Sequence, residues 1–166
     1  CWIGIRFEEI VSSARRTMSE VKTKENPDVV VGLFHAGWDG GIKTPAYDED
    51  ASKKVAQEVP GFDVVFFGHD HTPHNSVEKN AAGREVICLD PANNAQRIAL
   101  ATLTLRPKNV KGKRQYTLTN ATGELVDVRE LKADEAFIRH FQPEIDSVKR
   151  WSGQVIGRFE NTIHTK

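Results

Sequence analysis

The 166-residue sequence has no net charge, no cysteine framework and no long apolar run. Its 23 lysine and arginine residues balance 23 aspartate and glutamate residues, and no basic block occurs. Nothing therefore indicates a surface for a nucleic-acid polymer or for anionic lipid. The longest apolar runs, Val29–Phe34 and Val64–Phe67, are far shorter than the roughly 20 residues that a transmembrane helix needs. We expect no membrane partner, and a ligand that is recognised by a local site.

Cysteine is nearly absent, since only Cys1 and Cys88 occur. They have no metal-binding spacing and allow a single bridge, so they do not indicate a redox compartment. Cys88 lies in an apolar run and is expected to be a small buried hydrophobic residue. The N-terminus lacks both a methionine and the basic-then-apolar order of a signal peptide, so we expect a chain cut from a longer protein.

Helical and strand patterns alternate in the first part of the chain. Apolar residues spaced by three and four predict a helix from Phe7 to Val21. The runs Val29–Phe34 and Phe62–Phe67 are typical of strands covered on both faces. Between them a glycine-rich loop at 36–41 precedes a short helix predicted over Asp48–Val59. Strands that alternate with helices favour an α/β layer, in which ligands gather beyond the carboxyl ends of the strands.

The later part of the chain has a different pattern. Strands are predicted at Glu85–Asp90, Ile98–Arg106 and Gln115–Val128, with turn residues between them. The basic segment Lys108–Arg114 is expected to be a solvated connection between two of these strands. This part therefore adds β structure that helices do not separate.

A second helical stripe begins after Ala133 and ends at Ser152–Gly153. Pro143 near its middle predicts a kink or a restart of the helix. The segment Val155–Phe159 is interpreted as a strand of a structure that continues beyond Lys166.

Three of the six histidines follow buried strands. His35 ends the first strand, and Gly68-His69-Asp70-His71 follows the second. Gly68 leaves the backbone free to turn, and two histidines separated by one residue in extended chain face the same side. A single histidine at a strand end is more often a hydrogen-bonded polar residue than a ligand, but two adjacent strand ends would bring both groups to one edge. The other three carry no assigned ligand role: His74 is expected in the loop after Pro73, as a supporting or a surface residue, and His140 and His164 are given none.

The segments Val29–Gly37 (VVVGLFHAG) and Asp63–His71 (DVVFFGHDH) resemble the last two signature blocks of calcineurin-like metallophosphoesterases. The similarity is to the 5'-nucleotidase and 2',3'-cyclic-nucleotide 2'-phosphodiesterase branch, and it covers about Phe7 to Pro107. It implies an α+β fold of α/β layers: part of a four-layer α/β/β/α sandwich, with a C-terminal linking helix. It also implies that the intact enzyme holds two divalent ions. Imidazole ligands suit Zn, Mn or Fe.

The resemblance implies that His35 and His69 bind one ion and that His71 binds the other. The earlier family blocks, Asp-x-His, Gly-Asp-x-x-Asp and Gly-Asn-His-Asp/Glu, are absent from the sequence. Those blocks supply the bridging carboxylate, the remaining ligands and the catalytic histidine. No catalytic residue is therefore assigned in this chain, and we expect little or no phosphoesterase activity from it alone.

By the same resemblance, residues 1–127 are the C-terminal half of a metallophosphoesterase domain. Residues 128–154 are a linking helix, and residues 155–166 begin a nucleotide-binding domain. The intact enzyme would act on a nucleotide or a cyclic nucleotide, in a periplasmic or extracellular location.

Two alternatives use only the residues present. One is a mononuclear metal-binding module or hydrolase with three histidine ligands. The other is a non-enzymatic scaffold in which the histidines merely cap strand ends.

If half of a sandwich is missing, apolar surface and strand edges are left open, and we expect a homodimer or a domain-swapped assembly.

Overall fold

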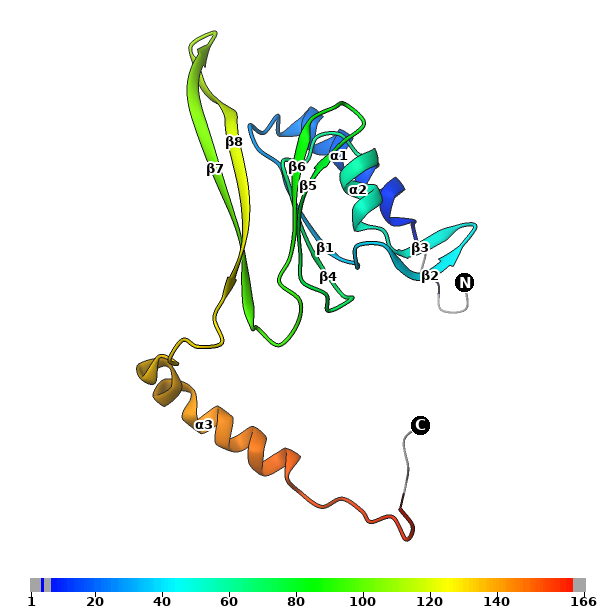
Figure 1. Ribbon diagram of the computed structural model, residues 1–166, viewed down its shortest axis with the longest axis vertical. Coiled ribbons are helices and arrows are strands. Elements are labelled where there is room, and N and C mark those ends of the chain that lie inside the picture. Colours follow the sequence, from blue (N-terminus) through cyan, green and yellow to red (C-terminus); the bar gives the residue numbers. More distant parts are fainter. Residues whose placement is uncertain (1–3, 5–6, 163–166) are drawn as a thin grey trace. The chain divides into compact units, whose positions relative to one another are not determined.

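The computed structural model describes Gly4 and residues 7–162 of the chain (Figure 1). The chain forms two compact units, residues 1–129 and residues 130–166. Cys1, with its one possible bridge, and His164 lie outside the described residues.

The first unit is built on a four-stranded sheet. Its helices and strands are α1 (Ile10–Lys24), β1 (Val31–His35), β2 (Gly40–Thr44), β3 (Tyr47–Asp50), α2 (Ser52–Glu58), β4 (Val64–Gly68), β5 (His74–Lys79), β6 (Glu85–Asp90), β7 (Arg97–Val110) and β8 (Lys113–Asp127). The sheet has the order β1-β4-β6-β5. Strands β1, β4 and β6 are parallel, and β5 is antiparallel to β6. The pairs β2–β3 and β7–β8 form separate two-stranded hairpins.

Each face of the four-stranded sheet has its own core. Helices α1 and α2 cover one face, where Met18 and Val55 pack with Val65 and Cys88 (Figure 1). The β7–β8 ribbon covers the other face, where Val64, Ile87 and Leu89 pack against the small and apolar side chains of the ribbon. The unit is thus an α/β/β stack, as the expected α+β sandwich requires.

Gly123 lets the ribbon approach the sheet. A Cβ atom at this position would lie 2.8 Å from a methyl carbon of Ile87 and 2.9 Å from one of Leu89. The Asn75 side chain also donates a hydrogen bond to the Gly123 carbonyl, at 3.0 Å. The two β layers are therefore joined by apolar contact and by one cross-layer hydrogen bond at this point.

The prediction that Val29–Phe34 is covered on both faces is wrong. Strand β1 is an edge strand, and Val31 and Leu33 on one of its faces are 51% and 85% exposed. The other face of β1 packs against the core beneath the helices, where Gly32 is buried and Phe34 contacts the core residues. By contrast, the predicted buried strand Phe62–Phe67 is confirmed by β4, in which both valines are fully buried.

Three local predictions also need correction. The expected helix Asp48–Val59 begins only at Ser52, because Tyr47–Asp50 is strand β3. Strand β5 begins at His74, a residue that was expected in a loop. Phe7 precedes helix α1 and is 83% exposed, although Val11, Ala14 and Met18 are buried as the stripe predicts.

The segment Lys108–Arg114 is mostly strand rather than a loose connection. Residues 108–110 continue β7 and 113–114 begin β8, so the turn is confined to Lys111 and Gly112. The segment is exposed, as expected. The predicted strand Glu85–Asp90 is confirmed with its bounds, and Cys88 is fully buried within it as a free cysteine.

The second unit contains helix α3 (Glu135–Ser152). Asp134 caps its first turn by accepting a hydrogen bond from the Phe137 N–H. The helix is continuous through Pro143, so it does not restart there. Val155–Phe159, predicted as a strand, has no regular structure. Among the described residues of the chain, no helix is long and apolar enough to cross a membrane.

Candidate metal centre

The candidate site lies where β1 and β4 end. These strands pair in parallel with His35 opposite Gly68, so the residue after Gly68 lies beside the His35 side chain. The histidines at the two strand ends are therefore brought to one edge of the sheet, as the sequence predicts.

Two ring nitrogens face each other at this edge. The Nε2 atom of His35 lies 3.4 Å from the Nδ1 atom of His69, and the ring centroids are 5.2 Å apart. Two imidazole nitrogens bound to one tetrahedral Zn²⁺, each at about 2.0–2.1 Å, lie roughly 3.3 Å apart. The separation of His35 and His69 therefore fits a shared metal ion.

The backbone at the Gly-His-x-His segment is strained. His69 has a φ of 134° and His71 a φ of 59°, both in regions that side-chain-bearing residues rarely adopt. Such a conformation costs roughly 1–3 kcal/mol per residue and is concentrated at functional sites. Because of these positive φ values, the two imidazoles do not follow the alternation of side chains between the two faces of strand β4.

His71 does not join the other two histidines. Its Nδ1 atom lies 3.3 Å from the side-chain amide nitrogen of Asn93, which belongs to the loop after β6. In the part of the chain that the structure describes, no three histidine, cysteine or acidic side chains are arranged to hold a metal ion. The geometry thus offers two ligands at one point, which disfavours a site made of all three histidines.

His74 and His140 lie in other environments. His74 packs against Trp38 with ring centroids 4.2 Å apart and the ring planes tilted by 33°, and its Nε2 atom lies 2.8 Å from the Ser76 hydroxyl. Burial lowers the pKa of His74. His140 is exposed on α3. His74 is therefore a packing residue of the first unit.

Glu49 is a neighbour of the site that the sequence analysis missed. Its Oε1 atom lies 3.4 Å from the Nε2 atom of His69, on the opposite side of the ring from His35. Its Oε2 atom accepts the Ile42 N–H at 2.8 Å. This backbone hydrogen bond, together with His69, lowers the pKa of Glu49. No signal pointed to Glu49, because the run from Asp48 was interpreted as the start of a helix.

Two further carboxylates hold the loop that follows His35. The Gly37 N–H donates to Asp50 at 2.7 Å, and the Trp38 N–H donates to Asp70 at 2.9 Å. Gly37 makes this possible, since a Cβ atom there would lie 2.6 Å from Asp50 Oδ1 and 2.8 Å from Asp70 Oδ2. These acids therefore organise the backbone around the site.

Asp90 ends β6 behind this edge and is fully buried. Its Oδ1 atom accepts the Ala92 N–H at 2.6 Å, whereas its Oδ2 atom has no hydrogen-bond partner within the described ranges, Gly4 and 7–162. Burial raises the pKa of Asp90, and the neighbouring Asp70 carboxylate raises it further. Asp90 is thus a buried acid next to the site, with one carboxylate oxygen that lacks a partner among the described residues.

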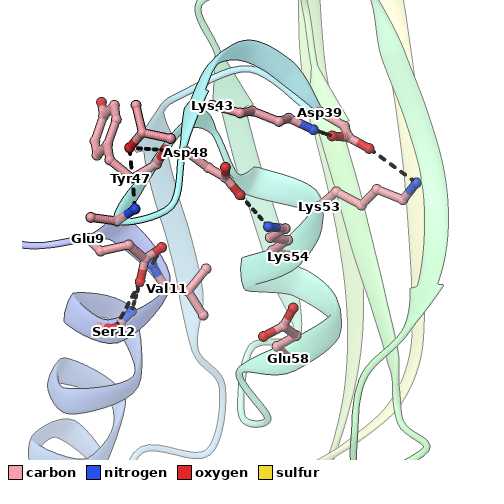
Figure 2. A network of polar contacts seen from close by, with 12 residues as sticks. Glu9, Val11, Ser12, Asp39, Lys43, Tyr47, Asp48, Lys53, Lys54 and Glu58 are labelled. Atoms are coloured by element: carbon pink, nitrogen blue, oxygen red, sulfur yellow. Dashed lines mark hydrogen bonds and ion pairs between the residues drawn. The ribbon is translucent and has the colours of Figure 1, made fainter.

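A network of ion pairs joins the β2–β3 hairpin and the residue before it to helix α2 (Figure 2). Asp39 lies 2.6 Å from Lys43 and 3.6 Å from Lys53 of α2, and Asp48 of β3 pairs with Lys54 of α2. Exposed ion pairs of this kind contribute little each, but together they restrict the position of the hairpin.

No protein-family model matches the sequence, and no curated protein matches it. Two solved structures resemble the chain. The calcineurin-like phosphoesterase YfkN from Bacillus subtilis has a TM-score of 0.71 and 18% identity, over 90% of this chain and 46% of that one. The 5'-nucleotidase precursor from Thermus thermophilus has a TM-score of 0.64 and 21% identity, over 90% of this chain and 29% of that one. The chain has the metallophosphoesterase fold and spans less than half the length of these two hydrolases.

Proposed function

We propose that this chain supplies part of the metal centre of a phosphoesterase that hydrolyses nucleotides, as a 5'-nucleotidase or a 2',3'-cyclic-nucleotide 2'-phosphodiesterase. The observation that carries the proposal is the 3.4 Å separation of His35 Nε2 and His69 Nδ1 at two parallel strand ends. The phosphoesterase and 5'-nucleotidase of similar fold support it.

His35 and His69 would hold one divalent ion, of Zn, Mn or Fe, and His71 would belong to a second ion site. When bound, such ions polarise the phosphoryl oxygens and activate water for in-line displacement. The task of this chain is to present unprotonated imidazole nitrogens from rigid strand ends, at a spacing set by the parallel pairing of β1 and β4.

The proposed organisation follows the phosphoesterase resemblance. Residues 1–127 would be the C-terminal half of the metallophosphoesterase domain, 128–154 the linking helix, and 155–166 the start of a nucleotide-binding domain. Nucleotides or cyclic nucleotides would be substrates of the intact enzyme, and its location would be periplasmic or extracellular. The missing carboxylate and histidine blocks leave this chain alone with little or no activity.

Metal titration tests the proposal. We expect Zn²⁺ to bind the chain at a site that the His35→Ala and His69→Ala variants each weaken, whereas His140→Ala, a change at an exposed histidine of α3, leaves binding unchanged. Isothermal titration calorimetry and elemental analysis give the affinity and the stoichiometry. Absence of Zn²⁺ binding by the unmodified chain would contradict the proposal.

The same titration separates the two alternatives. A scaffold whose histidines only cap strands predicts unchanged metal content after His69→Ala combined with His71→Ala. A mononuclear module with three histidine ligands predicts one tightly held ion that His71→Ala releases. Phosphate release from 5'-AMP and ring opening of 2',3'-cyclic AMP to 3'-AMP, followed by chromatography, complete the test, since turnover close to that of an intact enzyme would contradict an incomplete active site.

A further inference from the structure

The Glu49 carboxylate makes one hydrogen bond and one ion-pair contact from its two oxygens. Its Oε2 atom accepts the Ile42 N–H at 2.8 Å, and its Oε1 atom lies 3.4 Å from His69 Nε2. The backbone hydrogen bond restrains one carboxylate oxygen, and the other oxygen lies toward the imidazole. The side chain is one-third exposed and thus partly shielded from water.

The hairpin presents Glu49 from a fixed direction. Side chains alternate along strand β3, so Asp48 and Asp50 point to one face and Glu49 to the other. Both neighbours are anchored: Asp48 pairs with Lys54 of α2 (Figure 2), and Asp50 is buried and accepts the Gly37 N–H. Because both flanking residues are held, the backbone at Glu49 is restrained and its side chain leaves β3 on the side of His69.

An irregularity in the hairpin creates the anchor for Glu49. The β2–β3 pairing shifts register between Gly40 and Lys43, and Ile42 is not among the paired residues. Its N–H is therefore available to the Glu49 carboxylate. Gly41, with a φ of 58°, leaves the space, since a Cβ atom there would lie 2.7 Å from Glu49 Oε2. The bulge and the glycine together bring the carboxylate to the site.

We infer that Glu49 is a positioning residue that accepts the Nε2–H of His69 and thereby leaves the Nδ1 lone pair directed at His35. An imidazole carries one proton when neutral, and the hydrogen bond at one nitrogen decides which nitrogen is free to bind a metal. Glu49 and His69 thus form a carboxylate–histidine pair, and the other ring nitrogen of His69 faces the imidazole of His35. The link to metal binding rests on the proposed function, whereas the tautomer of His69 does not.

The tautomer is measured directly in the metal-free chain. Long-range ¹H–¹⁵N correlation spectra at a pH where the imidazole is neutral should show His69 protonated at Nε2 only. Glu49→Ala should give a mixture of the two tautomers, and Glu49→Gln, whose amide oxygen still accepts one hydrogen bond, should lie between. Glu124→Ala, at an exposed glutamate of β8, is the matched control and should leave the spectrum unchanged. A wild-type tautomer in both Glu49 variants overturns the inference.

Zn²⁺ affinity provides the second measurement. Loss of a residue that orients a metal-binding histidine commonly weakens metal binding 10–100-fold, and we expect a loss of about that size for Glu49→Ala and a smaller one for Glu49→Gln. Equal affinity in the wild type and both variants overturns the role in metal binding while leaving the proposed function intact. If the wild type binds no Zn²⁺, the proposed function fails, and the tautomer measurement still decides the role of Glu49. Circular dichroism checks that each variant is folded. If Glu49→Ala does not fold, Glu49→Gln alone is compared with the wild type in both measurements.

Discussion

Single residues near the candidate site differ in how far the sequence revealed them. His35 and His69 were found because they follow apolar runs, and the structure places their ring nitrogens 3.4 Å apart. His71 was found by the same motif, but its ring faces Asn93, a residue 22 positions later in the chain. Glu49 and Asp90 were not assigned a role, because a contact between residues far apart in the chain leaves no pattern in the sequence around either partner.

The buried Asp90 carboxylate should lower the stability of the chain at neutral pH. Its pKa is raised in the folded state, so the folded chain holds this proton more tightly than the unfolded chain. Stability is therefore lost as the pH rises through the folded pKa, and Asp90→Asn should remove that loss. We therefore expect Asp90→Asn to raise the free energy of unfolding at pH 7, because the asparagine has no charge to bury.

Urea denaturation at pH 7 and at pH 3 measures this effect. Below the unfolded pKa, about 3.9, aspartate is neutral in both states, so the difference between the variant and the wild type should shrink. Asp28→Asn, at an exposed position, is the control. A variant that is less stable at pH 7 would show that the Asp90 charge is needed in the fold.

Cys88 should be inert in the folded chain. Burial raises the pKa of its thiol to about 12, and thiol reagents attack the thiolate. In a Cys1→Ser variant, 5,5'-dithiobis(2-nitrobenzoate) should label Cys88 only after denaturation by guanidinium. Labelling of the native variant at the rate of a free thiol would contradict the burial of β6.

At the scale of helices and strands, the long apolar patterns were reliable and the short polar elements were not. Helix α1, strand β4 and strand β6 follow from hydrophobic spacing. The β2–β3 hairpin was missed, because four acidic or aromatic residues of β3 resemble the start of a helix as much as a strand. Its strand state depends on tertiary contacts, namely the ion pair of Asp48 with Lys54 and the burial of Asp50.

Helix α3 should become more stable when Pro143 is replaced. Proline inside a helix removes a backbone hydrogen bond and costs about 3 kcal/mol relative to alanine. No residue of α3 is buried, so within the described part of the chain packing does not offset this cost. Pro143→Ala should therefore slow hydrogen exchange of the α3 amides, by up to about 100-fold.

The matched control for this change is Gln142→Ala, which keeps the backbone hydrogen bonds of the same turn. Its amides should exchange within a few-fold of the wild-type rate. Equal protection of α3 in the Pro143→Ala variant and the wild type would mean that the proline does not weaken the helix.

At the scale of the whole molecule, the first unit exposes the free edge of its sheet and one face of strand β1. Within residues 7–162, β1 pairs with β4 alone in this sheet, and Val31 and Leu33 are exposed beside its free edge. An unpaired apolar edge strand favours association with another chain. We expect the chain to form a homodimer or a domain-swapped assembly through this edge.

Leu33→Lys tests the association, since a charge on this exposed residue opposes burial in an interface without disturbing the core. Burying a leucine contributes roughly 1.5–3 kcal/mol, so the dimer dissociation constant should rise about 10–100-fold. Leu131→Lys, at an exposed leucine of the second unit, is the control. Light scattering gives the masses, and a monodisperse monomer of the unmodified chain would contradict the expectation.

The sequence by itself determined the buried strands β4 and β6, the helices α1 and α3 and the histidines that follow the strands, because hydrophobic periodicity and strand-end position are local properties. It also carried the resemblance to metallophosphoesterases, and the solved structures confirm the fold that this resemblance implies. Only the tertiary structure decided which histidines meet, that one face of β1 is open, and that Glu49 stands behind His69. These features depend on which strands pair and on where loops from distant parts of the chain come together, and no local pattern of residues encodes that.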